Sequence, residues 1–140
     1  MKVAIVGAGK LGYKLAEVLL NSENYVIVID ENAQVLERVN EQLDVLTINA
    51  SGLQMDVLDK IDIESCDFVI AVTDADETNM IICMMAKRLG CKTTIARIRD
   101  PEYVKQSDFI KSSMQIDHLV NPELATADEI VRHLVKGHAF

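Results

Sequence analysis

The stretch Val3-Ala-Ile-Val-Gly7-Ala-Gly9-Lys-Leu-Gly12 decides the fold of this chain. A short apolar run leads directly into the spacing G-x-G-x-x-G, and Asp30 closes the next apolar run, Tyr25 to Asp30. A buried strand, a glycine loop, a helix and an acid at the end of the second strand form the fingerprint of a dinucleotide-binding fold. The sequence therefore predicts a nucleotide site in its first thirty residues.

Each part of this fingerprint has a physical role. Gly7 permits the tight turn out of the strand, Gly9 lets the backbone approach a pyrophosphate, and Gly12 lets the helix pack closely on the strand. The N–H groups at the helix start attract negative charge. Asp30 can accept hydrogen bonds from the hydroxyls of an adenosine ribose, and it would repel the extra phosphate of NADP. The predicted loop contacts are Gly7, Ala8, Gly9, Lys10, Leu11 and Gly12.

Two alternatives to this interpretation stay open. The glycines of a doubly wound domain can serve only as turn formers, without a ligand. Lys10 is either a point-charge contact to a phosphate or a solvated lysine on the first helical turn. It does not belong to a Walker-type phosphate loop, because that motif needs a glycine where Ala4 stands and a serine or threonine where Leu11 stands.

The length and composition indicate one globular domain. The 140 residues are 49% hydrophobic and 26% charged, and the net charge is −8. This charge argues against nucleic acid or an anionic membrane as a partner, because both reward a basic face. The longest apolar runs have the length of strands, so we expect no membrane insertion and a cytoplasmic protein. Cys66, Cys83 and Cys91 lack metal-ligand spacing, and Cys83 is expected to be a small buried hydrophobe.

Apolar runs alternate with helical patterns from end to end, which predicts an α/β fold with a doubly wound, Rossmann-like arrangement. We expect six parallel strands in the order 3-2-1-4-5-6, with helices on both faces. The strands are predicted at 2–6, 25–29, 44–48, 67–72, 93–98 and 117–120. The helices are predicted at 10–22, 32–42, 53–59, 75–89, 101–110 and 122–137.

Ligands of such sheets bind outside the carboxyl ends of the strands, where the strand order reverses. Asp30 and Glu31 follow the second strand, and the small polar residues from Thr47 to Gly52, which include Asn49 and Ala50, leave room for an adenine ring. After the fourth strand, Thr73 or Asp74 either caps the next helix or lines the pocket beside the ribose or phosphates. Arg97, at the end of the fifth strand, is a phosphate or interface contact, or else forms a surface ion pair.

The apolar helices leave their partners open. The helix from Thr78 to Gly90 is apolar over most of its circumference, so it either meets a partner subunit or is buried within the domain. The last helix has an apolar stripe that packs on its own sheet or against another copy of the chain.

Catalysis is not favoured by the distribution of possible acids and bases. His118, His133 and His138 all lie near the end of the chain, and none is placed as a general acid or base beside a nicotinamide. A dehydrogenase also needs a substrate domain, for which little of the chain remains. Nucleotide binding without chemistry is the preferred hypothesis, and a small NAD-dependent oxidoreductase, or the nucleotide-binding fragment of one, is the alternative.

Three blocks together resemble the TrkA N-terminal domain, of the RCK (regulator of potassium conductance) family. They are Val3–Gly12, Asp67-Phe-Val-Ile-Ala-Val-Thr-Asp-Ala-Asp-Glu-Thr-Asn79 and Ala96-Arg-Ile-Arg-Asp-Pro-Glu-Tyr103. The resemblance implies a cytoplasmic regulatory subunit, at the inner face of the plasma membrane, that gates a membrane potassium channel or transporter. It implies a homodimer or higher ring, and NAD(H) or ATP/ADP as the ligand. The implied contacts are Gly7, Gly9, Lys10, Leu11, Asp30, Glu31, Asn49, Ala50, Thr73, Asp74 and Arg97.

The resemblance also has consequences for domain organisation and mechanism. It makes the helix at 122–137 a crossover element of the dimer, and it makes residues 1–140 one nucleotide-binding lobe. Full-length members continue into a smaller C-terminal lobe that this sequence lacks. The alternatives are a piece of a longer protein, which we prefer, and a stand-alone nucleotide lobe. Nucleotide would favour one dimer arrangement over another, with a coupling of about 1–3 kcal/mol. An assembly module that has lost its ligand is a further alternative.

Overall fold

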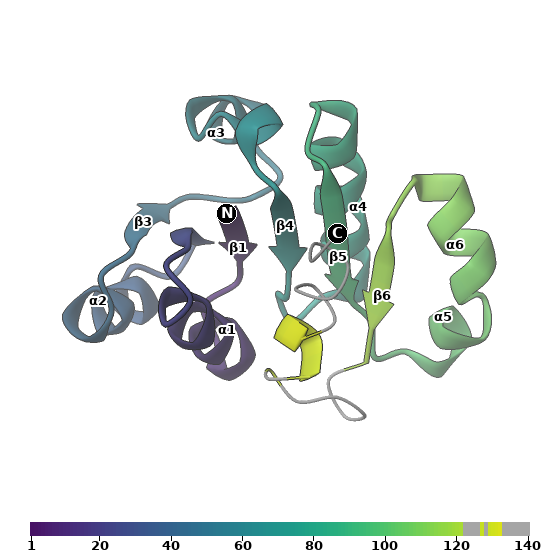
Figure 1. The fold of residues 1–140 in the computed structure, drawn as a ribbon. Helices are drawn as coiled ribbons and strands as arrows, with labels where there is room; N and C mark the ends of the chain where they lie inside the picture. Colours follow the sequence, from purple (N-terminus) through teal and green to yellow (C-terminus); the bar gives the residue numbers. More distant parts are fainter. Residues whose placement is uncertain (122–126, 128, 133–140) are drawn as a thin grey trace.

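The computed structural model describes residues 1–121, 127 and 129–132. Its centre is a six-stranded parallel sheet with the strand order β3-β2-β1-β4-β5-β6, as predicted (Figure 1). The strands are β1 (Lys2–Val6), β2 (Tyr25–Asp30), β3 (Leu46–Asn49), β4 (Phe68–Ala71), β5 (Thr93–Arg97) and β6 (His118–Val120).

The position of β1 creates the site at which a ligand can enter. Val3 of β1 is in register with Val26 of β2 on one side and with Phe68 of β4 on the other. The chain moves outward from β1 in both directions, so the order of the strands reverses beside it. This is the switch point at whose carboxyl side such sheets form a crevice.

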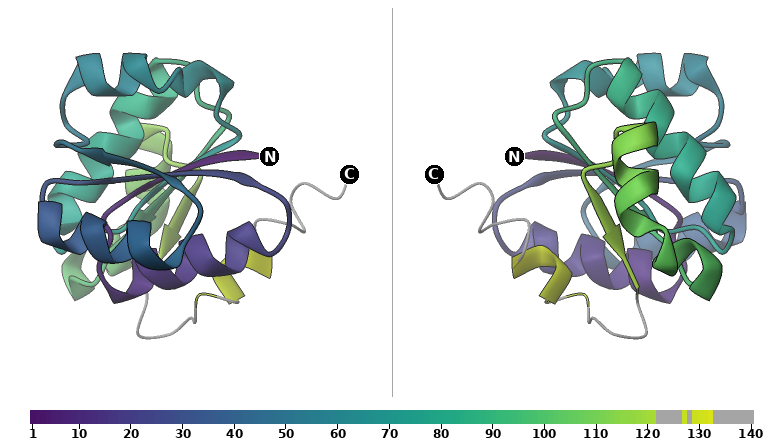
Figure 2. Two further views of the ribbon diagram at one scale, coloured as in Figure 1. Left: turned by 90° about the vertical axis from the view of Figure 1, so that its left-hand side faces the viewer. Right: turned by 90° about the vertical axis from the view of Figure 1, so that its right-hand side faces the viewer.

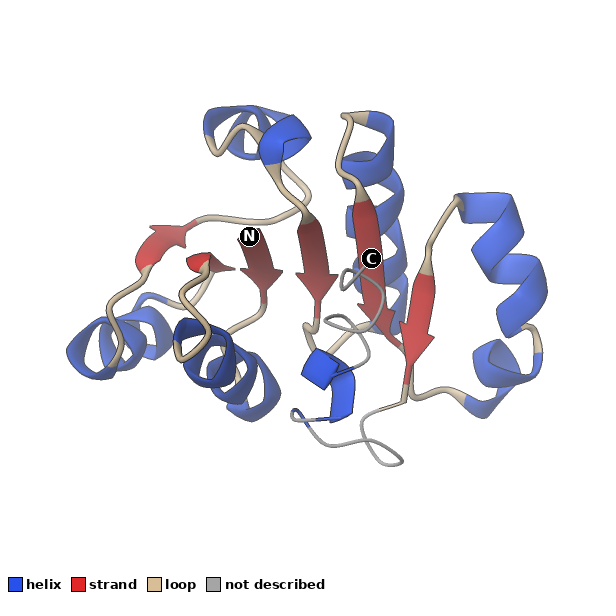
Figure 3. Cartoon of the chain, viewed as in Figure 1, coloured by secondary structure: helices blue, strands red, loops and turns tan. Residues whose placement is uncertain are grey.

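Helices cover both faces of the sheet, as the continuous apolar strands require. Figure 2 shows the sheet between the two layers, and Figure 3 shows the same elements by type. One face packs on α1 (Lys10–Leu20) and α2 (Ala33–Gln42). The other packs on residues of α3 (Met55–Lys60), the 3-10 turn η1 (Ile63–Ser65), α4 (Asp76–Arg88) and α6 (Ser107–Met114), and α5 (Pro101–Lys105) leads into α6.

Some boundaries differ from the prediction. The helix expected at 101–110 is two helices, because Gln106 leaves helical geometry (φ −103, ψ 17) and α6 then runs on to Met114. The left-handed residue Gln115 ends it. The strand expected at 44–48 is shifted to Leu46–Asn49, and the helix expected at 53–59 begins at Met55.

The outer side of α4 keeps part of its apolar surface exposed. Ile82, Cys83 and Ala86 are buried against the sheet, whereas Ile81 is 40% and Met84 37% exposed. The helix is therefore buried along one face only.

The helix predicted at 122–137 lies mostly outside the described residues, as do His133 and His138. Residues 127 and 129–132 are helical. Ala127, Ile130 and Val131 are buried in the same core cluster as α1. In the parts of the chain that are described, no helix has both the length and the apolar character to cross a bilayer.

Candidate functional site

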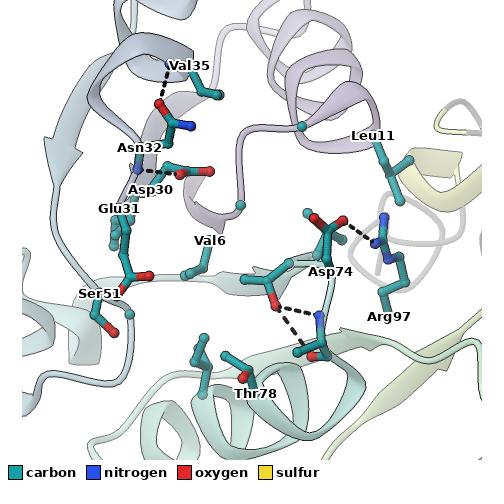
Figure 4. A pocket seen from close by; sticks show the side chains of 18 of the residues that line it. Val6, Leu11, Asp30, Glu31, Asn32, Val35, Ser51, Asp74, Thr78 and Arg97 are labelled. Atoms are coloured by element: carbon teal, nitrogen blue, oxygen red, sulfur yellow. Dashed lines mark hydrogen bonds and ion pairs between the residues drawn. The ribbon is translucent and has the colours of Figure 1, made fainter.

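A cavity of about 780 Å3 opens at the carboxyl ends of β1, β2, β4 and β5 (Figure 4). Most of the residues predicted to contact a nucleotide lie around it. They are Gly7, Gly9, Lys10, Leu11, Asp30, Glu31, Ala50, Thr73, Asp74 and Arg97. Ala8, Gly12 and Asn49 do not line the cavity, although their neighbours do.

The glycine loop forms one wall, and its three glycines meet different surroundings. Gly7 has φ +108, and a Cβ there would lie 2.8 Å from the carbonyl carbon of Val72. A Cβ on Gly12 would lie 1.8 Å from the Gly7 carbonyl oxygen. A Cβ on Gly9 would meet no atom of the described residues within 4 Å. Gly7 and Gly12 are therefore required by the fold, whereas Gly9 leaves space in the cavity.

The start of α1 presents backbone donors to this space. The hydrogen bond from Tyr13 N to the Gly9 carbonyl oxygen, 2.9 Å long, opens the helix, and the N-cap residue Gly9 has no side chain with which to cap it. The N–H groups of Lys10 and Leu11 belong to the first turn, which has no intrahelical acceptor. With the positive end of the helix dipole, they make the loop attractive to an anion.

Asp30 joins the glycine loop to the end of β2. Its Oδ2 accepts a hydrogen bond from Ala8 N at 2.7 Å, and its Oδ1 accepts one from Asn32 N at 2.8 Å. Each carboxylate oxygen can accept a second hydrogen bond. Asp30 therefore holds the loop in place and still has acceptor capacity toward the cavity, while the Ala8 amide is already engaged.

Asn49 supports the backbone at this side of the cavity. Its Nδ2 donates to the carbonyl oxygens of Asp30 at 3.0 Å and Glu31 at 2.8 Å. Ala50 N donates to the Asp30 carbonyl oxygen at 3.1 Å. The side-chain NH2 group of Asn49 thus binds the protein backbone and is not directed to a ligand. Ala50, Ser51 and Gly52 form the wall of the cavity where we expect an adenine to lie.

The loop after β4 is held by a residue that sequence reasoning missed. Asn79, completely buried, accepts from Thr73 N at 2.8 Å through Oδ1. It donates through Nδ2 to the carbonyl oxygens of Thr73 at 3.1 Å and Arg97 at 3.0 Å. The available signal was a lone amide directly before the apolar run Met80–Cys83, because a buried polar group needs partners.

Of the two alternatives for Thr73 and Asp74, the structure favours the second, because both residues line the cavity and neither is the N-cap of α4. Ala75 is the N-cap residue and makes no side-chain cap hydrogen bond. Thr73 Oγ1 instead donates to Asn79 Oδ1 at 2.6 Å, and this bond directs it into the loop. The Asp76 carboxylate, in the first turn of α4, accepts from the backbone N–H groups of Arg99 at 3.0 Å and Asp100 at 2.8 Å. Asp76 and Arg99 were not singled out as site residues, yet they tie together the two loops at the mouth.

Arg97 places a positive charge against the cavity. It is 8% exposed, and its Nη2 lies 3.3 Å from Asp74 Oδ1. Its Nε, also buried, has no hydrogen-bond partner within the part of the chain that the structure describes. Burial and the nearby charge of Arg99 lower the pKa of Arg97. A buried guanidinium with a free donor is suited to bind an anion.

The three cysteines do not line the cavity. All three are free and buried, and burial raises the pKa of Cys91 to about 11 and that of Cys83 further. Cys83 is fully buried, as predicted. Over the described residues, no group of three or more histidine, cysteine or acidic side chains is arranged to hold a metal ion.

A comparison with protein families matches residues 3–122 to the TrkA-N domain. Curated relatives carry the name Trk system potassium uptake protein TrkA. The relative from Vibrio alginolyticus is 36% identical over 135 residues, which are 94% of this chain and 30% of that protein. A homologue from Archaeoglobus fulgidus is 38% identical over 132 residues, with the same coverage of both chains. The chain thus spans about 30% of the length of these relatives.

Solved structures share the fold at low sequence identity. The TrkA-N domain of the inner membrane protein ybaL from Escherichia coli superposes with a TM-score of 0.76 at 19% identity, over 96% of this chain and 94% of that one. The GsuK channel bound to NAD superposes with a TM-score of 0.73 at 18% identity, over 85% of this chain and 21% of that one. GsuK bound to ADP gives a TM-score of 0.73 at 18% identity, over 86% and 31%.

Proposed function

The chain belongs to the TrkA-N domain family, and from this membership we propose that it is the nucleotide-binding lobe of a regulator of membrane potassium transport. Its curated relatives are named as potassium uptake proteins. On this proposal the lobe works on the cytoplasmic side of the membrane, as a homodimer or larger ring, and reaches the membrane through its transporter partner. It binds a ligand and does not transform it.

The observation that carries the proposal is the open space beside Gly9. Two neighbouring glycines are packed against backbone, but a Cβ on Gly9, the N-cap residue of α1, would meet no described atom within 4 Å. Among the residues that the structure describes, no packing contact requires a glycine there. A ligand that brings a diphosphate close to the backbone does require one.

The chemistry around the cavity supports an adenine nucleotide as the ligand. The remaining acceptor capacity of Asp30 suits the two hydroxyls of an adenosine ribose, and its charge disfavours a 2′-phosphate. The first turn of α1, with Lys10, suits a diphosphate, and Arg97 extends the cationic side of the cavity. GsuK, which shares the fold, has been solved with NAD and with ADP. NAD(H) and ATP/ADP are therefore the candidates.

Regulation then follows from differential binding. A nucleotide shifts the arrangement of subunits only if it binds one arrangement more tightly than another. A coupling of about 1–3 kcal/mol between the nucleotide and the membrane partner is typical of such systems. The cavity lies between loops from both halves of the sheet, so a ligand there contacts both halves at once.

The test is a calorimetric titration of the chain with NADH, NAD, ATP, ADP and NADPH in parallel. We expect at least one ligand without a 2′-phosphate to bind, and we expect NADPH to bind at least about tenfold more weakly than NADH because its 2′-phosphate faces Asp30. Sedimentation with and without the tight ligand reports the arrangement of subunits. NADH absorbance over time reports any turnover.

Gly9→Ala supplies the matched variant. Because its Cβ enters empty space, the free energy of unfolding should change by less than about 1 kcal/mol, the scale of an N-cap substitution. Nucleotide affinity should fall about tenfold or more, because the methyl group occupies the path of the diphosphate. Binding of none of the five nucleotides, or unchanged binding to Gly9→Ala, would contradict the proposal. Steady oxidation of NADH with a substrate would favour the dehydrogenase alternative.

A further inference from the structure

The ion pair between Arg97 and Asp74 joins two very unequal environments. Arg97 is 8% exposed, whereas the side chain of Asp74 is fully exposed, at 101% of its reference area. The cation is fixed in the wall of the cavity and the anion stands in solvent at its mouth. Figure 4 shows the interaction between the two side chains as a dashed line.

This pair leaves the guanidinium poorly satisfied. A guanidinium has five N–H donors, and a carboxylate in good geometry engages two of them in parallel. Asp74 reaches Nη2 alone, at 3.3 Å, and Nε has no partner among the described residues. An exposed carboxylate with a single long contact contributes little to stability. Arg97 thus has capacity for a better anion.

The surroundings hold the arginine more firmly than the aspartate side chain. The Arg97 carbonyl oxygen accepts from the buried Asn79 at 3.0 Å, which fixes the backbone at the end of β5. The Asp74 carbonyl oxygen accepts from Arg99 Nη2 at 3.0 Å, which fixes the loop backbone. The carboxylate of Asp74 can therefore rotate away without displacing either loop.

We propose that Asp74 is a stand-in anion, which occupies the position of a nucleotide phosphate on Arg97 until that phosphate displaces it. The inference rests on the proposed function and goes beyond it. A residue that contacts the ligand raises its affinity, whereas Asp74 is assigned the opposite effect. A phosphate offers several oxygens to Nε and Nη2 together, and an unremoved carboxylate would repel it. Asp74 thus lowers affinity for phosphate-bearing ligands and keeps the buried cation paired when the site is empty.

The experiment compares ADP binding to the wild type, Asp74→Asn, Arg97→Gln and Asp44→Asn by calorimetry at one salt concentration. Asp44 is exposed and lies outside the cavity, so its variant matches the change in charge and side-chain type. We expect Asp74→Asn to lower the Kd for ADP about three- to tenfold, the scale of one competing charge. Arg97→Gln should raise it about tenfold or more, and Asp44→Asn should leave it within about twofold.

Adenosine, which carries no phosphate, separates the phosphate effect from a general change in the cavity. Its affinity should be the same for the wild type and Asp74→Asn. Weaker or unchanged ADP binding by Asp74→Asn overturns the inference and leaves the proposed function standing, because the wild type still binds. An equal gain for adenosine and ADP also overturns it. If ADP binds to none of the four proteins, the inference falls, and the nucleotide panel on the wild type decides separately on the proposed function.

Discussion

The amino ends of the parallel strands form one edge of the sheet, here the amino edge, and their carboxyl ends form the other, the carboxyl edge. Polar groups are satisfied differently at these two edges. At the amino edge, charged groups are satisfied by protein: Asp67 Oδ2 accepts from Lys2 N at 2.9 Å, and Lys2 Nζ donates to the Ile61 carbonyl oxygen at 2.7 Å. Asp117 Oδ2 accepts from Lys87 Nζ at 2.9 Å and from Thr94 N at 2.8 Å. These hydrogen bonds lie at the amino ends of β1, β4, β5 and β6.

At the carboxyl edge, several polar groups can still form further hydrogen bonds. The helix start at Gly9 has no side-chain cap, Arg97 Nε lacks a partner within the described residues, and a cavity of about 780 Å3 separates the loops. Stability and binding therefore depend on different ends of the same strands. Substitutions at the amino edge should change unfolding, and substitutions in the cavity wall should change affinity.

The largest loss of stability should come from a residue that lies at the carboxyl edge but is needed for folding. Gly12 stands in the glycine motif at the carboxyl edge, yet a Cβ there would lie 1.8 Å from a backbone oxygen that cannot move aside. Gly12→Ala should destabilise the fold by about 3 kcal/mol or more, the upper range of overpacking. Urea unfolding measures this, and Gly9→Ala is the control from the same motif. A loss below about 1 kcal/mol for Gly12→Ala would show that helix and strand can separate cheaply.

An intermediate effect is expected at Asn79, where the two functions meet. Asn79→Leu removes an amide that is completely buried and leaves the Thr73 N–H and the Arg97 carbonyl without that partner. The unsatisfied groups should cost about 2–3 kcal/mol in unfolding free energy. Nucleotide affinity should fall as well, because both loops lose their anchor. Urea unfolding and calorimetry on one sample test this, and full affinity in a destabilised variant would argue that the loops position themselves.

The smallest loss of stability is expected at the amino edge, for a substitution of Asp117. Burial raises the pKa of Asp117, but hydrogen bonds from Lys87 and Thr94 outweigh it, so the pKa is lowered overall. A lowered pKa adds stability above the unfolded pKa of about 3.9, and this stability is lost as the pH falls through the folded pKa. Asp117→Asn should lose about 1 kcal/mol at neutral pH, since the carboxylate is partly exposed.

The readout for Asp117→Asn is unfolding free energy as a function of pH. Its decline below about pH 4 should be shallower than in the wild type, because one titrating group is gone. Nucleotide affinity should stay within about twofold of the wild type, as the residue lies at the opposite edge of the sheet. A large loss of affinity would mean that the two edges are coupled.

Much of the architecture could be predicted because it depends on local patterns. Alternating apolar runs predicted the doubly wound fold and with it the strand order, and the helix predicted to begin at residue 101 does begin there, with Pro101 in its first turn. Boundaries failed where tertiary contacts decide. Thr73 does not cap α4. The Asp76 carboxylate, in the first turn of this helix, instead accepts hydrogen bonds from the backbone N–H groups of Arg99 and Asp100, and no local sequence pattern encodes such a contact.

The candidate site could be located from the sequence more easily than its residues could be given roles. Gly7, Asp30 and Arg97 do line one cavity, because the carboxyl ends of adjacent parallel strands meet. Asn49, however, spends its amide on two backbone carbonyls, and Arg97 is buried beside an exposed acid. These roles depend on burial and on the direction of a side chain, neither of which residue spacing reveals.

The empty space at Gly9 has a consequence for the history of such proteins. A glycine codon becomes an alanine codon by one base change, and no neighbour in the described part of the chain packs closely enough to resist it. Selection for a folded chain alone would therefore let this position drift, while Gly7 and Gly12 stayed fixed. A lineage that kept the domain for assembly but lost its ligand would show that drift first at Gly9, so the residue found there is a record of whether the descendant still responds to nucleotide.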